Sequence, residues 1–237
     1  MNKEPLLITG VGKRVGLHLA HTFLDRGIPV IGTYRMTRSS VTELEQKGAE
    51  LYQCDFDEEA QIHTLIEHVL CNHSSLRAII HNASDWLADK AELTSSEIMR
   101  RMMQVHVSAP YQLNLALEHL LEASEASHAD IIHVGDYVSS RGSKKHIAYA
   151  ASKAAQDNLT QSFAAKLAPR IKVNSLAPAL VLFNPEDNED YRRKALDKSL
   201  MQREAGLDEF QLAIDYLLQS HYVTGRVLPM DGGRHLR

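Results

Sequence analysis

Tyr149 and Lys153, four residues apart, are the side chains of this sequence best suited to acid–base chemistry. On a helix, positions i and i+4 project from the same face. A lysine ammonium one turn away stabilises a phenolate, so we expect it to lower the tyrosine pKa from about 10 toward the working range of a proton donor. The same spacing also occurs in ordinary surface helices, so the pair needs support from the rest of the chain.

A glycine-spaced turn near the N-terminus, Thr9-Gly10-Val11-Gly12-Lys13-Arg14-Val15-Gly16, follows an apolar run and opens an amphipathic segment. Gly10 and Gly12 allow the backbone to turn tightly and to approach a pyrophosphate, and Gly16 allows a helix to pack close to a strand. The N-terminus of the following helix offers free N–H groups to phosphate oxygens. The turn therefore predicts a dinucleotide site.

Residues after the second apolar run distinguish between the two nicotinamide dinucleotides. The run ends in Tyr34-Arg35, with no Asp or Glu to bind an adenosine ribose 2′-hydroxyl. Arg35, Arg38 and the Ser39-Ser40 hydroxyls instead offer positive charge and donors for a 2′-phosphate, and Lys13 is a further candidate. We therefore expect NADPH rather than NADH. A solvated basic loop is the alternative.

Asp55 and Phe56 follow the third apolar run, where the adenine ring of a dinucleotide would lie. The carboxylate of Asp55 can accept a hydrogen bond from the exocyclic amine of adenine. An aspartate that caps the following helix explains the same residue about equally well.

Short apolar runs that alternate with longer amphipathic segments predict the elements that position these residues. The runs predict strands at Leu6–Thr9, Pro29–Tyr34, Glu50–Gln53, Arg77–His81, Asp130–Val134, Lys172–Leu176 and Val227–Pro229. The segments predict helices at Arg14–Arg26, Glu58–Leu70, Ser95–Leu121, Ile147–Leu167 and Leu207–Leu218. The alternation predicts one α/β domain over residues 1–237, a Rossmann-type, doubly wound parallel sheet of seven strands flanked by helices. Such sheets bind ligands beyond the carboxyl ends of their strands.

The stretch Leu180–Arg203 is the only long irregular one, and Asn184-Pro185-Glu186-Asp187-Asn188-Glu189-Asp190 breaks its periodicity. It is too short for a second domain and lies near the expected ligand edge. We expect a substrate lid, with an ordinary polar insertion as the alternative.

Composition limits the classes of partner. A net charge of −4 without a basic block argues against nucleic acid. No apolar run approaches the roughly 18–20 residues of a membrane span, and Met1–Glu4 leads into a strand rather than a signal peptide. Cys54 and Cys71, without CxxC spacing, fit a reducing cytoplasm. The 13 histidines show no zinc-like spacing with cysteines or carboxylates, so we expect no metal.

Four motifs together resemble the short-chain dehydrogenase/reductase family in order and spacing: Thr9-Gly-x-x-x-Arg-x-Gly16, His81-Asn82-Ala83-Ser84, Tyr149-x-x-x-Lys153 and Asn174-Ser-Leu-Ala-Pro178. The resemblance covers nearly the whole chain, to the terminal Asp231-Gly-Gly. It implies that Asn82, Ala83 and Pro178 join the cofactor site and that Lys153 binds the nicotinamide ribose hydroxyls. It also implies a homotetramer, with a dimer as the alternative.

Two positions depart from the family pattern. Members that reduce ketones carry a serine about thirteen residues before the tyrosine, whose hydroxyl donates to the substrate oxygen; Asp136 stands there in this chain. An ionised carboxylate cannot donate and would repel a forming alkoxide, whereas it can accept from the N–H and amino groups of a pterin. A carboxylate that only caps a turn is the alternative. His106 replaces the usual asparagine; it can still organise a backbone carbonyl and water near Lys153, and its part in proton relay stays open.

Asp136 with its thirteen-residue step to Tyr149, Arg14, and Asn82-Ala-Ser-x-Trp86 resemble the pteridine reductase branch of the family. Leu182-Phe183-Asn184 and the terminal Asp231–Arg237 resemble its bacterial members. The resemblance implies NADPH-dependent reduction of a 7,8-dihydropterin, such as dihydromonapterin and more weakly dihydrofolate, by hydride transfer to C6 and protonation at N5.

The same resemblance implies roles for individual residues. Trp86, the only tryptophan, would stack on the pterin, an ordinary core or surface aromatic being the alternative. Arg14 and Ser84 would hold pterin polar atoms and the cofactor pyrophosphate. Asp136 would accept from the pterin and position Tyr149, which would donate or relay the proton.

Two other functions remain open from the sequence. One is an NADPH-dependent carbonyl reductase acting on 3-oxoacyl thioesters or sugars, against which Asp136 counts. The other is a regulator that senses NADPH without turnover, against which the intact Tyr149 and Lys153 pair counts.

Overall fold

Strand β1 (Leu6–Ile8) lies inside a seven-stranded parallel sheet in this computed structural model, which describes residues 4–237. The strand order is β3-β2-β1-β4-β5-β6-β7, so the direction of winding reverses between β1 and β4. The remaining strands are β2 (Val30–Tyr34), β3 (Glu50–Gln53), β4 (Ala78–His81), β5 (Ala129–Val134), β6 (Ile171–Pro178) and β7 (Val227–Met230). The predicted doubly wound parallel sheet is confirmed. The expectation for Met1–Lys3 lies outside the described residues.

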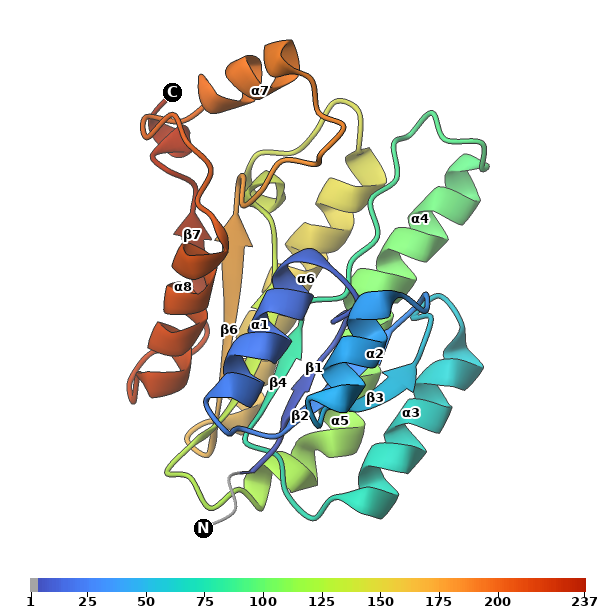
Figure 1. The fold of residues 1–237 in the computed structure, drawn as a ribbon. Coiled ribbons are helices and arrows are strands. Elements are labelled where there is room, and N and C mark those ends of the chain that lie inside the picture. Colours follow the sequence, from blue (N-terminus) through green and yellow to red (C-terminus); the bar gives the residue numbers. More distant parts are fainter. Residues whose placement is uncertain (1–3) are drawn as a thin grey trace.

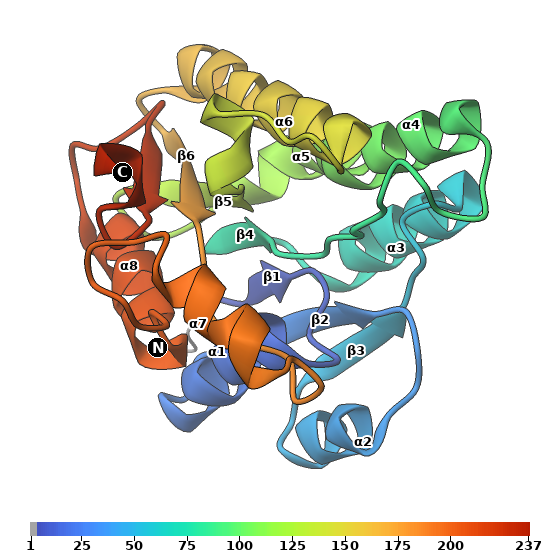
Figure 2. The same cartoon turned by 90° about the horizontal axis from the view of Figure 1, so that it is seen from above.

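Helices cover both faces of the sheet, as the views from the side and from above show (Figures 1 and 2). One face carries α1 (Arg14–Asp25), α2 (Ser39–Gln46) and α8 (Leu207–Gln219); the other carries α3 (Glu59–Asn72), α5 (Ala109–Glu122) and α6 (Ile147–Leu167). α4 (Ser95–Met103) precedes α5, and α7 (Glu189–Leu196) lies above the carboxyl ends of the strands. No helix between residues 4 and 237 has the length and apolar character needed to cross a membrane.

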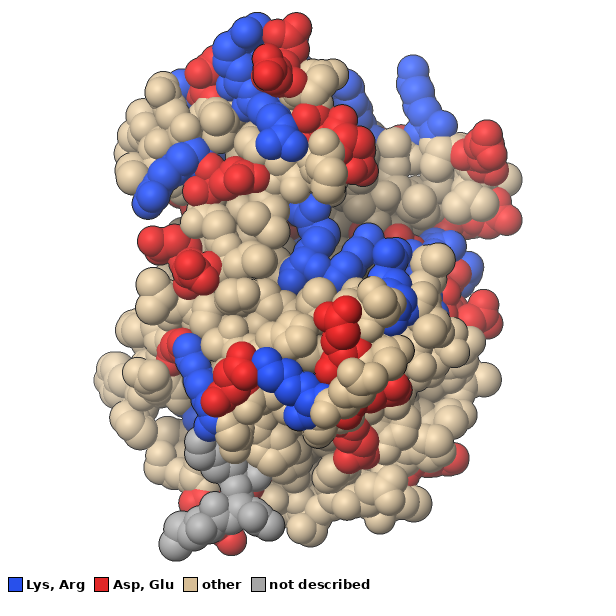
Figure 3. Space-filling model, in the orientation of Figure 1, with Lys and Arg blue, Asp and Glu red and all other residues tan. Residues whose placement is uncertain are grey.

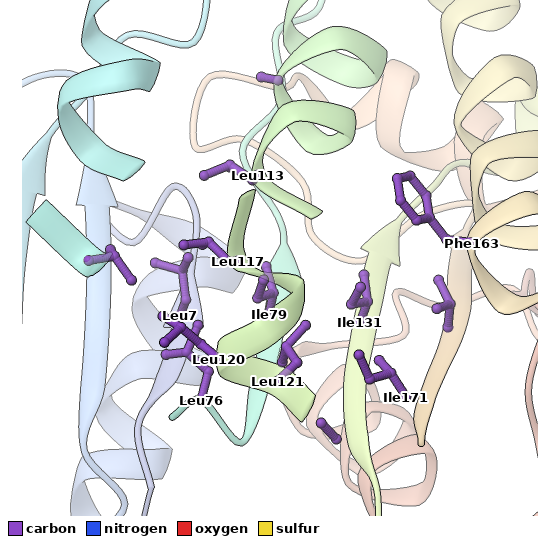
Figure 4. Close-up of a cluster of buried hydrophobic side chains, with 14 of the residues drawn as sticks. Leu7, Leu76, Ile79, Leu113, Leu117, Leu120, Leu121, Ile131, Phe163 and Ile171 are labelled. Carbon is purple, nitrogen blue, oxygen red and sulfur yellow. The ribbon is translucent and has the colours of Figure 1, made fainter. Parts of the chain in front are cut away.

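The core consists of two apolar layers, one on each face of the sheet. In β1, Leu7 packs in the layer beneath α3, α5 and α6, whereas Leu6 and Ile8 pack in the layer beneath α1 and α8. Figure 4 shows the first layer, where Leu113 and Leu117 of α5 face the sheet. Because successive strand residues point to opposite faces, burial on both sides requires continuous apolar runs. This is why the strands were visible in the sequence.

Three helical features differ from the sequence predictions. The expected helix Ser95–Leu121 is interrupted by a π-helical turn at Gln104–Ser108. Pro110 has no N–H to donate to the carbonyl of His106 four residues earlier, so regular α-helical bonding cannot continue there. α2 and α7 were not predicted, because α2 buries only Val41 and Leu44 and α7 buries no residue.

Candidate active site

A cavity of about 670 Å³ opens at the carboxyl ends of the strands. The glycine turn, the loop after β4, the first turns of α6 and the start of the 180–203 segment border it. Of the residues that the sequence predicted for cofactor, substrate or catalysis, Ser39 and Ser40 are not among those that line this cavity. The others line it: Gly10, Gly12, Lys13, Arg14, Gly16, Arg35, Arg38, Asp55, Phe56, Asn82, Ala83, Ser84, Trp86, Asp136, Tyr149, Lys153 and Pro178. The fold therefore brings the separate motifs into one place.

The glycine turn is held closely against the loop after β4. A Cβ on Gly16 would lie 2.1 Å from the Gly10 carbonyl oxygen, and a Cβ on Gly10 would lie 2.9 Å from Ala83 Cα. The Asn82 amide donates to the carbonyls of Thr9 and Gly10, at 3.0 Å each. Gly10 also adopts a φ of 76°, a conformation that favours glycine. The turn thus needs glycine for its own packing as well as for any approach of a ligand.

Basic side chains gather at the end of the cavity next to α2. Figure 3 shows them near the centre of this face, where the amino ends of α1 and α2 lie below α7. Arg35 pairs with Asp85 at 3.1 Å, and Arg101 approaches the same carboxylate at 2.6 Å. Among the residues that the structure describes, Lys13 and Arg38 make no side-chain hydrogen bond or ion pair, which leaves their charges open to a ligand.

The sequence predicted that the Ser39 and Ser40 hydroxyls donate to a 2′-phosphate, with a solvated basic loop as the alternative. Ser39 and Ser40 form the first turn of α2. The Ser40 hydroxyl donates to the Gly12 carbonyl at 2.7 Å, so it stabilises the glycine turn. Sequence reasoning missed this contact because it joins α2 with the glycine turn, two segments that are far apart in the sequence.

Asp55 and Phe56 lie at the cavity wall beyond β3. Asp55 accepts a hydrogen bond from the Asp57 N–H at 3.1 Å, whereas Glu58 is the residue that precedes α3. The alternative that Asp55 caps this helix is therefore wrong, because its carboxylate closes a tighter local turn. Phe56 is buried, and its ring forms part of both the core and the cavity wall.

Tyr149 and Asp136 form the polar centre of the cavity. The Tyr149 hydroxyl donates to Asp136 Oδ2 at 2.8 Å, and the Val138 N–H donates to Oδ1 at 2.9 Å. Burial raises the pKa of Tyr149 well above its ordinary value, and the Asp136 carboxylate raises it further. The expected lowering of this pKa by Lys153 is therefore wrong for the protein on its own, because spacing along a helix reveals a neighbour and not the degree of burial.

Lys153 is buried directly behind Tyr149. Its Nζ donates to the Val134 carbonyl at 2.7 Å and to Gln156 Oε1 at 3.3 Å, and lies 5.8 Å from the Tyr149 ring centroid. Burial lowers the pKa of Lys153 from 10.5 to about 8, although the carboxylates of Asp136 and Asp157 act in the opposite direction. The two residues share one helix face, as predicted, and burial brings the pKa of Lys153 closer to neutrality than that of an exposed lysine.

His106 contacts different groups from those expected. Its Nε2 lies 2.9 Å from Ser84 Oγ and its Nδ1 lies 2.9 Å from Ser152 Oγ. Burial lowers the pKa of His106 well below its ordinary value, and the charge of Lys153 lowers it further. The imidazole thus connects the loop after β4 with α6 instead of organising a carbonyl beside Lys153.

Trp86 lies at the mouth of the cavity and is 64% exposed, so it is not a core aromatic. One face of its ring stacks on His146, with ring centroids 4.0 Å apart and planes inclined by 22°. The His146 Nδ1 in turn lies 3.0 Å from the Leu87 carbonyl oxygen. No local signal in the sequence connects these two rings, and their stacking orients the indole at the entrance.

Arg14 reaches across the cavity to the 180–203 segment. Its guanidinium donates to the Leu182 carbonyl at 2.9 Å and to the Asn184 side chain. Arg14 also adopts a φ of 54°, a left-handed conformation that is uncommon for residues other than glycine, asparagine and aspartate. Sequence reasoning assigned Arg14 to ligands alone and missed this contact between the glycine turn and the segment above it.

The chain as a whole is similar to proteins of a known family. A family model described as enoyl-(acyl carrier protein) reductase matches residues 10–235. A dihydromonapterin reductase of Klebsiella pneumoniae is 54% identical over 234 residues, which are 99% of this chain and 98% of that protein. The chain belongs to the short-chain dehydrogenase/reductase family. Within this family, a dihydromonapterin reductase of Escherichia coli is 52% identical over 233 residues, which are 98% of this chain and 97% of that protein.

Solved short-chain dehydrogenase/reductase structures share the fold. A FolM alternative dihydrofolate reductase 1 from Brucella canis, in complex with NADP, has a TM-score of 0.85 at 25% identity and covers 100% of this chain and 95% of its own. A blue fluorescent protein from a metagenomic library, in complex with NADPH, has a TM-score of 0.82 at 26% identity, with 98% of both chains covered.

Among residues 4–237, no group of three or more His, Cys, Asp or Glu side chains is arranged to hold a metal ion.

Proposed function

We propose that this chain catalyses the NADPH-dependent reduction of a 7,8-dihydropterin to the tetrahydropterin. The hydrogen bond between Tyr149 and Asp136 carries the proposal, because it sets a proton donor beside a carboxylate that can only accept. The relatives named above as dihydromonapterin reductases, at 52% and 54% identity, support dihydromonapterin as the substrate. The NADP-bound structure named as an alternative dihydrofolate reductase supports weaker turnover of dihydrofolate.

The residues of the cavity fit NADPH. Gly10 and Gly12 line the cavity, and the residue before α1 makes no side-chain hydrogen bond to the first N–H groups of this helix, so these are available to a pyrophosphate. Lys13, Arg35 and Arg38 supply positive charge for a 2′-phosphate. Asp55 and Phe56 border the adenine end, and Asn82, Ala83 and Pro178 border the nicotinamide end. When bound, NADPH supplies the hydride that reaches C6 of the substrate.

Tyr149 and Lys153 hold and move the proton that accompanies reduction. Because its pKa is raised, Tyr149 keeps its proton at neutral pH and can donate it to N5 as electron density arrives there. Lys153, buried behind the phenol, stabilises negative charge that develops on Tyr149 and offers its ammonium to the ribose hydroxyls of the cofactor.

The residues that bind the substrate in this proposal surround Tyr149 and Lys153. Asp136 accepts from N–H and amino donors of the pterin and positions the Tyr149 phenol. Trp86 offers the ring face opposite His146 for stacking. Ser84 and Arg14 hold further polar atoms of the pterin, and Arg14 also reaches the pyrophosphate. A ketone substrate would place a developing alkoxide against the Asp136 carboxylate, which disfavours the carbonyl reductase alternative.

The 180–203 segment serves in this proposal as a substrate lid. Two backbone hydrogen bonds close its base, from Ala205 N to Leu180 O at 3.1 Å and from Gly206 N to Val181 O at 3.0 Å. Arg14 ties the segment to the glycine turn, so the arrival of a ligand can change its position. Slower proteolysis between residues 184 and 189 in the presence of NADPH would support the lid, and an unchanged rate would contradict it.

The family resemblance also leads us to propose a homotetramer, with a dimer as the alternative. Exposed apolar side chains on α5 and α8 support this assembly: Tyr111, Leu115, Leu212 and Tyr216. Light scattering distinguishes the tetramer from a dimer and from a monomer. We further propose a cytoplasmic location, which the free thiols of Cys54 and Cys71 support.

One assay tests the activity. The protein is incubated with NADPH and, in turn, dihydromonapterin, dihydrofolate and a 3-oxoacyl thioester, while the nicotinamide absorbance is followed. We expect turnover in the order given and none with the thioester. Tyr149→Phe is expected to lose roughly 10²–10⁴-fold in turnover while retaining NADPH affinity. Turnover of the thioester alone would establish the carbonyl reductase, and NADPH binding without any turnover would establish the regulator.

A further inference from the structure

His106 occupies a buried junction between the two sides of the cavity. It is fully buried within the π-helical turn Gln104–Ser108. Toward the loop after β4, its Nε2 lies 2.9 Å from Ser84 Oγ and 3.2 Å from the Asp85 backbone nitrogen. Toward α6, its Nδ1 lies 2.9 Å from Ser152 Oγ. One side chain therefore spans from the substrate loop to the helix that carries Tyr149.

The hydrogen-bond partners determine which nitrogen of His106 carries the proton. The Asp85 backbone N–H can only donate, so Nε2 must be an unprotonated acceptor. In the neutral ring the proton is then on Nδ1, which donates to Ser152 Oγ. The Ser152 hydroxyl in turn donates to the Tyr149 carbonyl at 2.7 Å, so the direction of every bond in the chain is consistent.

This tautomer determines whether the Ser84 hydroxyl donates or accepts in its hydrogen bond with His106. With Nε2 as an acceptor, the Ser84 hydroxyl gives its proton to the imidazole at 2.9 Å, which is closer than its other acceptor, the Asp85 carbonyl oxygen at 3.4 Å. The Ser84 oxygen then presents its lone pairs to the cavity that it lines. Together with the Asp136 carboxylate, it forms a pair of acceptors on the cavity wall. Such a wall suits a heterocycle with N–H and amino donors and does not suit a carbonyl oxygen, which needs donors.

We propose that His106 is a positioning residue that orients Ser84 as a hydrogen-bond acceptor and thereby helps to select donor-bearing heterocycles. This inference rests on the proposed function, because it concerns how the site recognises the N–H and amino donors of a dihydropterin. A histidine that only fills the core would leave the orientation of Ser84, and with it the substrate, unaffected.

Replacement by two amides separates the two ends of the imidazole. His106→Gln places an amide oxygen near the position of Nε2, where it can accept from Ser84 and Asp85. His106→Asn is shorter and reaches only toward Ser152. We expect His106→Asn to raise the KM for dihydropterin roughly tenfold or more, as expected for loss of a buried hydrogen-bond partner, and His106→Gln to stay within about threefold of wild type. The dissociation constant of NADPH should change little in either variant.

His133→Gln is the matched control. His133 is another fully buried histidine, bonded to Thr160 at 2.7 Å, and it does not line the cavity. This variant is expected to lower the melting temperature without changing the KM for dihydropterin. A double variant supplies a second check, since Ser84→Ala should have little further effect on KM in the His106→Asn background.

Fluorescence of the only tryptophan gives a readout that does not depend on turnover. Trp86 lies two residues beyond Ser84, so release of the loop should increase quenching of its emission by iodide in His106→Asn but not in His106→Gln or His133→Gln. A wild-type KM in His106→Asn, an equal loss in both amide variants, or unchanged quenching would overturn the inference. A wild type without dihydropterin turnover would instead overturn the proposed function, with the quenching comparison still deciding whether His106 positions the loop.

Discussion

The hydroxyl of Tyr149 donates a hydrogen bond to Asp136 Oδ2 at 2.8 Å. The two residues come from different elements, since Asp136 follows β5 and Tyr149 lies in the first turn of α6. The anion and the buried surroundings together raise the pKa of Tyr149, so the phenol stays protonated at neutral pH. The pair therefore stores a proton next to a group that can only accept, an arrangement suited to protonating a nitrogen that has just gained electron density.

Substitution of Asp136 tests whether its charge or its capping bond matters. Asp136→Asn and Asp136→Ser both keep an oxygen that can accept from the Val138 N–H, so the turn stays capped. Neither keeps a carboxylate for Tyr149 and the substrate. We expect the ratio of dihydropterin to ketone turnover to fall roughly tenfold to a hundredfold in both variants.

Asp89→Asn is the control for Asp136, because the Asp89 carboxylate caps α6 through the Ile147 N–H at 3.0 Å and does not line the cavity. It should reduce stability slightly and leave the turnover ratio unchanged. If the Asp136 variants behaved like this control, the carboxylate would have only a capping role.

The pKa of Lys153 predicts how stability depends on pH. The folded protein lowers this pKa from 10.5 to about 8, so between these values the folded state has released a proton that the unfolded state retains. The free energy of unfolding therefore rises with pH in this window. Compared with Lys153→Met, the wild type should gain roughly 2–3 kcal/mol between pH 8 and pH 10. Denaturant unfolding at several pH values measures the difference, and parallel curves for the two proteins would show that the Lys153 pKa is not lowered.

Arg38 predicts how the protein distinguishes the two nicotinamide cofactors. Arg35 already shares Asp85 with Arg101, whereas the Arg38 side chain has no partner among the described residues. Arg38→Ala should therefore weaken NADPH binding roughly tenfold to a hundredfold and leave NADH binding nearly unchanged.

Calorimetry with both cofactors measures this discrimination. Arg193→Ala is the control, because Arg193 is an exposed arginine of α7 that pairs with Asp190 and lies outside the cavity. Equal losses of affinity for NADPH and NADH in Arg38→Ala would mean that the guanidinium does not bind the 2′-phosphate.

Most of the sheet could be predicted because burial on both faces leaves a continuous apolar signal in central strands such as β1 and β4. In helices the corresponding signal is a stripe of apolar residues on one face. This stripe is weak in α2, which buries two residues, and absent in α7, which buries none. α7 instead has Glu189 and Asp190 in its first turn and Arg193 and Lys194 in its last turn, charges that favour a helix through its dipole. Hydrophobic periodicity therefore reveals the elements that form the core, but not a helix such as α7 that is stabilised by charges at its own ends.

The candidate site could be predicted as a set of residues but not as a set of contacts. Spacing placed Tyr149 and Lys153 on one face, and both line the cavity. Spacing could not show that Asp136 would raise the Tyr149 pKa or that Arg14 would bind the 180–203 segment, because these depend on burial and on contacts between distant segments. The tautomer of His106 likewise follows only from the direction of the Asp85 N–H.

Two glycines of the turn separate a packing requirement from a ligand requirement. A Cβ on Gly16 would lie 2.1 Å from the Gly10 carbonyl oxygen and 2.5 Å from Asn82 Nδ2, so the turn itself would have to move. A Cβ on Gly12 would lie 3.6 Å from Tyr34 Cβ, an ordinary contact. Gly16→Ala should therefore destabilise the protein by roughly 1–3 kcal/mol, measured by denaturant unfolding without ligand.

Gly12→Ala should unfold at nearly the wild-type denaturant concentration and yet bind NADPH at least roughly tenfold more weakly, because the added methyl occupies the space through which a pyrophosphate approaches the backbone. Calorimetric titration of NADPH into the folded variant measures this loss. Wild-type affinity in Gly12→Ala would show that the cofactor does not approach the turn at Gly12. Equal stability of Gly16→Ala and wild type would show that the turn can move without cost, and the close packing of α1 on the sheet would then have to depend on other contacts.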